Sequence, residues 1–451
     1  MTPRRSDLDG RIRQGRGSVA VRESGPERAV LVGIHGVEPG RDPEIEELAR
    51  LADSAGAVVV GTLVQHRTKP VPATFLGRGK VEELKRLSGQ LGADLVIADH
   101  ELTPVQQRNL EDALELKVID RTALVLDIFA RRAQTHEGRL QVELAQMTYL
   151  LPRLTGRGTA LSRLGGGIGT RGPGETKLEV DRRRIRRRIT DLRAQIGEIR
   201  QHRALQRKAR REAQFPTVAL VGYTNAGKST LLNALTDAGV FVEDKLFATL
   251  DPTVRKVTLP NGQPVLLTDT VGFITRLPTQ LVAAFRATLE EVTEADVLVH
   301  VVDGSHPDWR DQMRAVSKVL AELDAADKPT IIAVNKTDQM PTAEARAVLA
   351  EAGEGVVISA LHKVGLLNLL RVISKHLPEG LVKVRLTVPY AQAGALSQMF
   401  THGRVLRQDY AEDGIRVEAE LPRVQAEQLR ALAQRWSSRR RRNQHGRTET
   451  D

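Results

Sequence analysis

The chain has 451 residues, a formal net charge of +11 and no cysteine. This length predicts about three domains, and the lack of cysteine excludes disulfides and thiolate metal sites. The excess of Lys and Arg indicates a polyanionic partner, whereas no run approaches the roughly 18 apolar residues of a membrane span. We therefore expect a soluble, cytoplasmic protein without a membrane segment, and we take it to be a monomer.

The N-terminal third is predicted to hold a basic arm and an α/β domain. Residues 1–27 are polar and Arg-rich without an apolar signal-peptide core, so a disordered arm is expected. Over 28–122, apolar runs at 29–34, 58–60, 95–97 and 117–119 alternate with helical segments near 42–55, near 81–91 and from Thr103. Alternation of this kind predicts a small parallel sheet. Phe75–Lys80 is a Gly-rich turn before a helix, or alternatively a phosphate cradle.

Residues 123–213 are predicted to form a helical hairpin. One long helix is expected over 124–151 and a second over 175–212, joined by a Gly-rich tip at 164–174. The second helix carries more Arg than its acidic residues can pair, which favours phosphate contacts over a solvated spacer. Structured RNA is the expected partner, because aromatic side chains for base stacking are scarce. The candidate RNA contacts are Arg171, Arg182, Arg183, Arg184, Arg186, Arg187 and Arg188.

A phosphate loop is the strongest motif of the chain. The apolar run 218–221 leads into G-x-x-x-x-G-K-S, from Gly222 to Ser229, followed by a helix-like stretch. The two glycines let backbone N–H groups surround phosphates at a helix N-terminus, where the helix dipole adds positive potential. Lys228 is expected to reach the β- and γ-phosphates, and the Ser229 hydroxyl is expected to ligate Mg²⁺.

Three further motifs in residues 214–380 predict guanine as the base. An apolar strand ends in D-x-x-G, where Asp269 would hold Mg²⁺ through water and the Gly272 N–H would meet the γ-phosphate. Another strand ends in N-K-x-D, whose Asp338 can accept two hydrogen bonds from guanine but none from adenine. The third motif, Ser359–Leu361, would contact the base through main-chain groups. The order and spacing predict a P-loop (Ras-like) GTPase domain.

The residues expected to contact GTP belong to these motifs and to one switch segment. Lys228, Thr249 and Gly272 are the candidate catalytic residues, and Ser229, Thr249 and Asp269 are the candidate Mg²⁺ ligands. Thr249 is the expected γ-phosphate sensor, with Thr253 as the alternative. The full set is Gly222, Tyr223, Thr224, Asn225, Ala226, Gly227, Lys228, Ser229, Thr230, Phe247, Ala248, Thr249, Leu250, Asp251, Asp269, Thr270, Val271, Gly272, Asn335, Lys336, Asp338, Ser359, Ala360 and Leu361.

Two positions bear on the rate of hydrolysis. Ras-like enzymes place a Gln directly after D-x-x-G to orient the attacking water, whereas this chain has Phe273 there. Slow intrinsic hydrolysis is therefore expected unless a partner completes the site. Asn225 resembles the Asn that helps several bacterial GTPases bind a monovalent cation such as K⁺, and it could equally shape the loop through local hydrogen bonds.

The C-terminal part is predicted to be a small α+β domain over 381–437. A strand is expected at 382–388, a helix near 393–400, a strand near 414–419 and a helix over 424–436. The Arg-rich tail 438–451 is expected to be disordered. It would contact nucleic acid or act only as a solubilising end.

From about residue 29 to 436 the chain resembles the HflX family of translation-associated GTPases. The most specific matching segments are Phe75–Lys80, Leu102–Glu111, Asp120–Phe129, Glu143–Gln146, Leu151–Gly156, Gly172–Lys177, Gly222–Ser229 and Phe247–Asp251. The resemblance implies a factor that binds the large ribosomal subunit and the whole ribosome in the GTP state and splits or rescues stalled ribosomes. It also implies that the hairpin tip approaches the peptidyl-transferase region and that Phe273 is the family's hydrophobic replacement of Gln.

Two other functions remain open from the residues. A general RNA-remodelling NTPase would be activated by any structured RNA and would use ATP. A GTP-gated regulatory switch would bind a protein partner even with the hairpin arginines neutralised.

Overall fold

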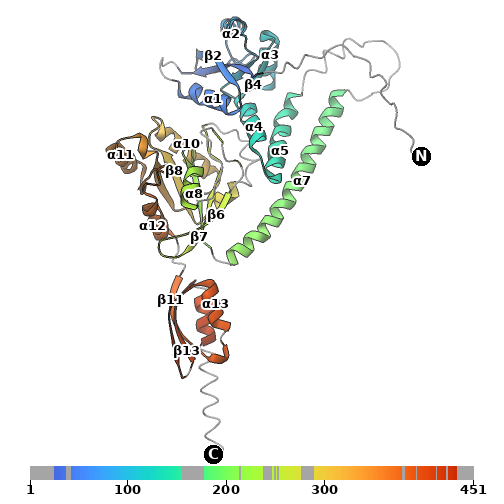
Figure 1. Cartoon of the computed structure of the whole chain (residues 1–451). Helices are drawn as coiled ribbons and strands as arrows, with labels where there is room; N and C mark the ends of the chain where they lie inside the picture. The colour runs from blue at the N-terminus through green and yellow to red at the C-terminus, as the bar shows by residue number, and fades with distance from the viewer. Residues whose placement is uncertain are drawn as a thin grey trace, which may run out of the picture.

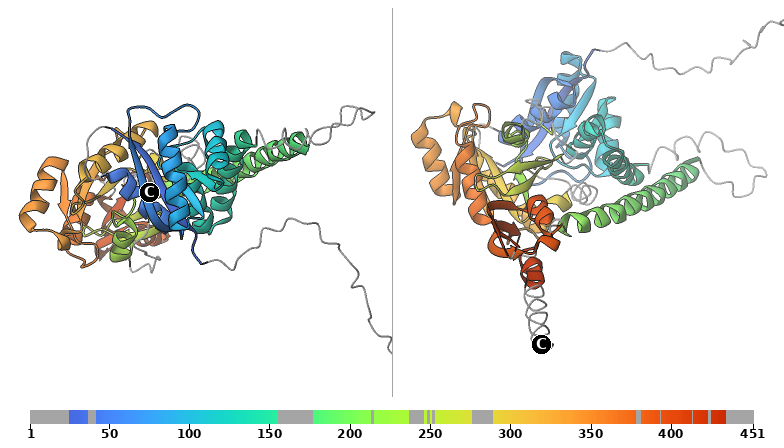
Figure 2. Two further views of the ribbon diagram at one scale, coloured as in Figure 1. Left: turned by 90° about the horizontal axis from the view of Figure 1, so that it is seen from above. Right: turned by 60° about the horizontal axis from the view of Figure 1, so that its bottom comes forward.

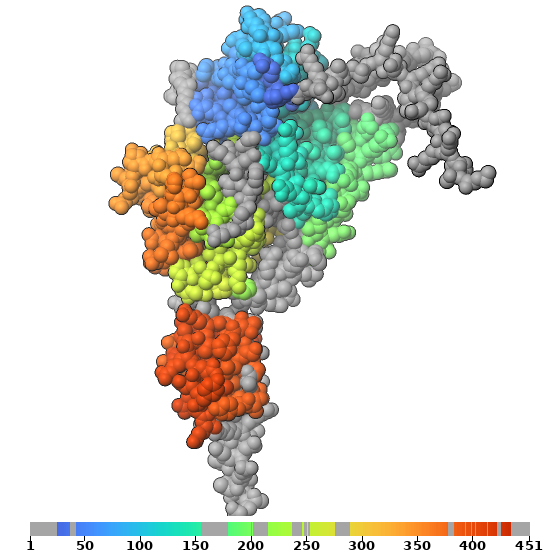
Figure 3. All heavy atoms as spheres, viewed as in Figure 1, coloured from blue at the N-terminus to red at the C-terminus, as the bar shows by residue number. Residues whose placement is uncertain are grey.

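The computed structural model describes residues 25–36, 42–154, 177–212, 215–236, 246–247, 250, 253–275, 289–377, 381–392, 394–412, 414–422 and 425–433. Three sheets and a pair of packed helices make up this part of the chain (Figure 1). The helices α5 (His136–Arg153) and α7 (Lys177–Glu212) lie beside the N-terminal and GTPase domains, and the C-terminal sheet forms a separate lobe below them (Figure 3). Among the described helices, none is long and apolar enough to cross a membrane.

The N-terminal domain is built on the predicted parallel sheet. Its strands lie in the order β2-β1-β3-β4, and the helices α1 and α4 pack on one face while α2 and α3 pack on the other. Alternate residues of β1 point to opposite faces, so that both faces are apolar and buried. The elements are β1 (Arg28–His35), α1 (Pro43–Ser54), β2 (Val58–His66), α2 (Arg78–Leu91), β3 (Leu95–Ala98), α3 (Pro104–Leu114) and β4 (Lys117–Asp120).

The helical region differs from the expected hairpin in its first arm. Instead of one helix over 124–151, the chain forms α4 (Arg121–Arg132) and α5 (His136–Arg153). The break occurs because the Thr135 side chain accepts a hydrogen bond from the backbone N–H of Gly138 and starts a new helix. The second arm is α7 (Lys177–Glu212), which packs on α5 through Leu140, Leu192 and Ile196. The tip 164–174 lies outside the described residues.

The GTPase domain has a six-stranded sheet in the order β10-β9-β8-β5-β7-β6. All pairs are parallel except β6 with β7, so β6 is an antiparallel edge strand that the sequence motifs did not predict. The strands are β5 (Thr217–Gly222), β6 (Thr253–Thr258), β7 (Pro264–Asp269), β8 (Val297–Asp303), β9 (Thr330–Asn335) and β10 (Gly355–Val357). The helices are α8 (Lys228–Thr236), α10 (Trp309–Glu322), α11 (Thr342–Ala352) and α12 (Leu366–His376).

The C-terminal domain is a three-stranded antiparallel sheet with helices. The strand order is β11-β13-β12, formed by β11 (Leu381–Val388), β12 (Arg404–Ala411) and β13 (Gly414–Pro422). The helix α13 (Gly394–His402) and the helical residues 425–433 contribute to one apolar core with the sheet. The sequence predicted these elements apart from β12.

One apolar cluster joins the N-terminal domain to the GTPase domain. Phe129 of α4 meets Phe247 of the switch segment edge-to-face, with ring centroids 4.7 Å apart. The same cluster contains Phe273 and residues of α1 and α10. The two views of Figure 2 agree with this arrangement, with the N-terminal sheet set against the GTPase domain and α7 running outward along its side. The switch segments therefore lie against a second domain.

Candidate GTP-binding site

The phosphate loop connects the buried strand β5 to the first turn of α8. Gly222 has φ +152°, and a Cβ there would lie 2.3 Å from the carbonyl oxygen of Val301. Gly227 has φ +93°, and a Cβ there would lie 2.3 Å from the side-chain nitrogen of Asn335. Both positions therefore require glycine, for conformation and for space. The loop geometry is that of a backbone cradle for an anion.

Lys228 points back into this loop from the start of α8. Its Nζ donates hydrogen bonds to the carbonyl oxygens of Gly222 at 3.2 Å and Tyr223 at 2.9 Å. Burial lowers the pKa of Lys228 to about 8, partly opposed by the nearby Asp269 carboxylate. Burial of the His300 ring, together with the Lys228 charge, lowers the pKa of His300 to about 4, so that this imidazole is neutral at physiological pH.

The oxygen ligands expected for Mg²⁺ come together at this point. Ser229 Oγ donates to Asp269 Oδ2 at 2.6 Å, and the Asp269 side chain is fully buried. A hydroxyl and a carboxylate, with waters completing the shell, are ligands that Mg²⁺ prefers. These residues therefore fit the ion that P-loop GTPases generally use. Ala248, Thr249 and Asp251 lie outside the described residues, while Thr253 begins β6 and pairs with Asp269 in the sheet register.

Gly272 and Phe273 bring the D-x-x-G segment against the phosphate loop. A Cβ at Gly272 would lie 2.7 Å from Thr224 Cα and 3.1 Å from Lys228 Nζ, so only glycine permits this approach. The Phe273 backbone accepts from Thr224 N–H at 2.8 Å and donates to the Gly222 carbonyl at 3.1 Å. The Phe273 ring is buried in the apolar cluster shared with the N-terminal domain. This apolar ring has no group that could hydrogen bond to an attacking water.

The base-recognition motifs are joined to the phosphate loop by Asn335. Its Nδ2 donates to the Ala226 carbonyl at 2.9 Å, and its Oδ1 accepts from the Ala360 N–H at 2.9 Å. Ser359 Oγ donates to Asp338 Oδ1 at 2.5 Å, which is the main reason that the pKa of Asp338 is lowered. Asp338 is thus presented as an ionised acceptor. Lys336 is ion-paired with Asp303 at 2.8 Å, and Leu361 is exposed.

A contact with the N-terminal domain was missed by the sequence motifs. The Tyr223 hydroxyl donates to the Glu47 carboxylate of α1, lies 2.6 Å from Thr275 Oγ1 and accepts from Thr275 N–H at 2.7 Å. Arg121 of α4 donates to Glu47 Oε2 at 2.5 Å and to the Thr275 carbonyl at 2.9 Å. Leu246 N–H donates to Ser54 Oγ at 3.1 Å. No sequence signal links these residues, because they are far apart in the chain.

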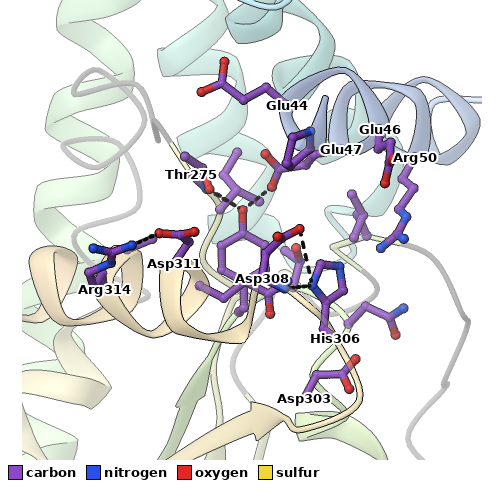
Figure 4. Close-up of a pocket in the computed structure, with 18 of the residues that line it drawn as sticks. Glu44, Glu46, Glu47, Arg50, Thr275, Asp303, His306, Asp308, Asp311 and Arg314 are labelled. Atoms are coloured by element: carbon purple, nitrogen blue, oxygen red, sulfur yellow. Dashed lines mark hydrogen bonds and ion pairs between the residues drawn. The ribbon is translucent and has the colours of Figure 1, made fainter. Parts of the chain in front are cut away.

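These contacts border a cavity of about 890 Å³ between the two domains. Its lining includes Glu47 from α1, Asn225 from the phosphate loop, and Asp303 and Asp308 near the end of β8. Figure 4 shows Glu47 and Thr275 directed toward the same hydroxyl, with His306 and Asp308 on the other side of the cavity. The phosphate loop is therefore reached from a space whose walls belong to both domains.

The candidate RNA contacts on α7 have different surroundings. Arg183, Arg184, Arg186 and Arg187 are exposed. Arg182 is half-buried, and Arg188 donates to both oxygens of Glu143 on α5, at 2.6 and 2.7 Å. Arg188 thus already contributes to packing between the two helices. Arg171 lies outside the described residues.

Comparison with known proteins identifies the family. Residues 42–130 match the family model described as GTP-binding GTPase N-terminal, residues 132–210 match the GTP-binding GTPase middle region, and residues 217–336 match the 50S ribosome-binding GTPase. GTPase HflX of Caldanaerobacter subterraneus subsp. tengcongensis is 51% identical over 404 residues, which cover 90% of this chain and 93% of that protein. The chain belongs to the HflX family of GTPases.

A second HflX relative, from Escherichia coli strain K12, is 42% identical, with 86% of this chain and 91% of that protein covered. A solved GTP-binding protein of the archaeon Sulfolobus solfataricus, in complex with GDP, has 23% identity, 78% of this chain and 98% of that chain covered, and a TM-score of 0.42. As an HflX GTPase, the chain is a GTP hydrolase of the 50S ribosome-binding family. The family, the α/β fold class and the hydrolase activity expected from the sequence are confirmed.

Proposed function

We propose that this HflX GTPase binds the large ribosomal subunit in its GTP state and splits or rescues stalled ribosomes, as a cytoplasmic monomer. The observation that carries the proposal is the exposed row of arginines on α7. Arg183, Arg184, Arg186 and Arg187 are exposed within one and a half turns, while apolar residues of the same helix pack on α5. A row of cations on one long helix is suited to the phosphates of structured RNA.

The length of α7 supports insertion into a ribonucleoprotein particle. With 36 residues, α7 spans about 54 Å at 1.5 Å per residue. It runs outward from the GTPase domain and then alongside α5 (Figure 1). A helix of this length, held by its apolar face on α5, can place its arginines far from the nucleotide site. It can also insert between two ribosomal subunits.

In the proposed nucleotide complex, the residues have separate roles. Lys228 and the phosphate-loop N–H groups bind the phosphates, the Gly272 N–H meets the γ-phosphate, and Asp338 accepts from guanine. Ser229 and Asp269 would hold Mg²⁺, which supplies charge neutralisation at the phosphates when bound. Thr249 is proposed as the γ-phosphate sensor.

Asn225 is proposed to help bind a monovalent cation beside the phosphates. It has φ +61°, a left-handed conformation that Asn tolerates, and it lines the cavity between the domains. Hydrolysis that is faster in K⁺ than in Na⁺ at equal ionic strength would support this role. The same rate in both salts would leave Asn225 with a loop-shaping role only.

The ribosome is proposed to stimulate hydrolysis. Phe273 occupies the position of the water-orienting Gln, and its ring is 1% exposed in an apolar cluster. The described part of the chain therefore offers no polar side chain at that position, and the ordering of water is assigned to the docked ribosome. Because the switch segments contact the N-terminal domain, docking of the ribosome on that domain can change the geometry of the nucleotide site.

The test is GTP hydrolysis by the purified chain alone and with large subunits, small subunits, whole ribosomes or an unrelated structured RNA. Stimulation by large subunits and not by the unrelated RNA, with loss of whole ribosomes on a sucrose gradient, is expected. Equal stimulation by every RNA, together with ATP use, would favour an RNA-remodelling NTPase. No stimulation by subunits would favour a GTP-gated protein switch.

A further inference from the structure

The carboxyl edge of the N-terminal sheet gathers a second set of ligand-type side chains. His35 ends β1, and Asp99 directly follows β3. These two strands are neighbours, and the helices that follow them, α1 and α3, pack on opposite faces of the sheet. The strand order therefore reverses between β1 and β3. In open parallel sheets, ligands bind in the crevice at this kind of switch point.

Three carboxylates surround the His35 ring in this crevice. Nε2 lies 2.9 Å from Asp99 Oδ2 and 3.4 Å from Asp42 Oδ2, and Nδ1 lies 3.0 Å from Glu44 Oε2. Both ring nitrogens of His35 therefore face carboxylate oxygens. Asp99 is the fully buried carboxylate of the three, and a buried carboxylate is stabilised by a nearby cation.

The hydrogen bonding of the cluster is incomplete at its centre. His35 Nε2 and Asp99 Oδ2 are buried, and neither makes a hydrogen bond within the described residues, although they are 2.9 Å apart. The Asp99 side chain is 0% exposed, so water from outside does not reach it. Two buried polar atoms that converge in this way are arranged as ligands for an ion between them.

Neighbouring residues hold these two side chains in place. A Cβ at Gly33 would lie 2.5 Å from His35 Nε2, so glycine at this position makes room for the ring. His100 Nδ1 lies 2.6 Å from Asp99 Oδ1 and directs the other carboxylate oxygen toward His35. Orientation of a ligand by a second hydrogen-bonding partner is typical of metal sites.

We propose that His35, Glu44 and Asp99 bind one divalent transition-metal cation at a site outside the GTP-binding motifs. Their ligand atoms lie within 4.8 Å of one another. Ligands placed about 2.1 Å from one ion lie up to about 4.2 Å apart, so small side-chain movements close the site. An imidazole beside carboxylates favours Zn²⁺ or a similar ion over Mg²⁺, which prefers oxygen ligands.

The test is titration of the untagged, chelator-treated full chain with Zn²⁺ by calorimetry, in excess GDP and Mg²⁺ so that the nucleotide site is filled. Co²⁺ is a spectroscopic probe of the same site through its visible absorption. One Zn²⁺ per chain is expected, with affinity at least about tenfold weaker in His35→Ala and Asp99→Asn. Gly33→Ala, which keeps every ligand but displaces the ring, should weaken binding as well.

The matched control is His136→Ala, an exposed imidazole at the start of α5. GDP affinity and circular dichroism establish that each variant is folded. Unchanged Zn²⁺ affinity in folded Asp99→Asn, or equal loss in His136→Ala, would overturn the proposal. So would the absence of binding to the unmodified chain, and the cluster would then be an ion-pair network around a protonated His35.

Discussion

The Tyr223 hydroxyl in the phosphate loop is hydrogen bonded to the Glu47 carboxylate in helix α1 of the N-terminal domain. Burial and the nearby Glu47 charge raise the pKa of Tyr223 far above its ordinary value, so the phenol stays a neutral donor. Thr275, three residues after Gly272, uses both its N–H and its hydroxyl on the same oxygen. Tyr223 therefore links the two domains through a polar contact beside the nucleotide site.

Replacing Tyr223 by Phe should destabilise the interface between the domains. The change removes the donor to Glu47 Oε1 and the acceptor of the Thr275 N–H, while Glu47 Oε2 keeps its bond from Arg121, and the loss should cost about 1–3 kcal/mol. Urea unfolding followed by circular dichroism measures the loss. Tyr390→Phe is the control, because its hydroxyl makes a single exposed bond to the Ala411 carbonyl and should matter by less than about 0.5 kcal/mol. Equal losses in the two variants would contradict the role given to Tyr223.

GTP binding should take up a proton near pH 8. The lowered pKa of Lys228, about 8, means that the free protein loses this charge as the pH rises through 8. Bound phosphates favour the ammonium form, so affinity should fall about fourfold between pH 7 and 8.5. Calorimetry in buffers of different ionisation enthalpy detects the proton. A pH-independent affinity, or the same uptake in Lys228→Met, would show that another group titrates.

Asp338→Asn should shift base preference from guanine toward xanthine. The carboxylate accepts two hydrogen bonds from guanine, and an amide cannot replace both, so the loss for GTP should reach about a hundredfold or more. The kcat/KM values for GTP and xanthosine triphosphate measure the shift. Asp327→Asn removes the same charge at an exposed position before β9 and should change neither value. Unchanged preference in Asp338→Asn would remove the guanine assignment.

Neutralising the exposed arginines of α7 should weaken binding to large subunits. Changing Arg183, Arg184, Arg186 and Arg187 to Gln keeps good helix formers and removes four cations. The slope of log affinity against log salt should fall by about 0.7–0.9 for each phosphate that is no longer neutralised. Sedimentation with large subunits at several salt concentrations measures it. Arg310→Gln with Arg314→Gln on α10 is the control for a general charge effect, and an equal change in slope would mean that only net charge matters.

Arg188 is expected to behave differently from these four arginines. Its bidentate pair with Glu143 joins α7 to α5, and because the pair is exposed, Arg188→Gln should lower stability only slightly. For Arg188→Gln, the slope of log affinity for large subunits against log salt should match the slope of the unchanged protein. A fall in slope equal to that for Arg187→Gln would show that Arg188 leaves Glu143 to contact RNA.

The motifs predicted which residues come together at one edge of the GTPase-domain sheet, because each motif is a local pattern with a local geometric cause. Gly222, Gly227 and Lys228 owe their places to a turn between one strand and one helix. Asn335 is the last residue of another strand of the same sheet, and Asp338 follows shortly after it. The ends of parallel strands meet at one edge, so separate short motifs combine into one site without knowledge of the rest of the fold.

Other features depended on contacts that local patterns do not contain. Phe247 packs on Phe129 and Tyr223 bonds to Glu47, which are pairings between residues more than 100 positions apart. The break between α4 and α5 had a local signal, the cap residue Thr135, that the apolar periodicity concealed. The strand β12 has mostly exposed or half-buried residues and therefore lacks an apolar run.

The side-chain amide of Asn335 couples the two ends of the nucleotide site. Its nitrogen holds the phosphate loop at Ala226, and its oxygen holds the base loop at Ala360. Displacement of either loop therefore disturbs the other, through a side chain that is itself buried. Free energies measured for the phosphate end and the guanine end should consequently be non-additive.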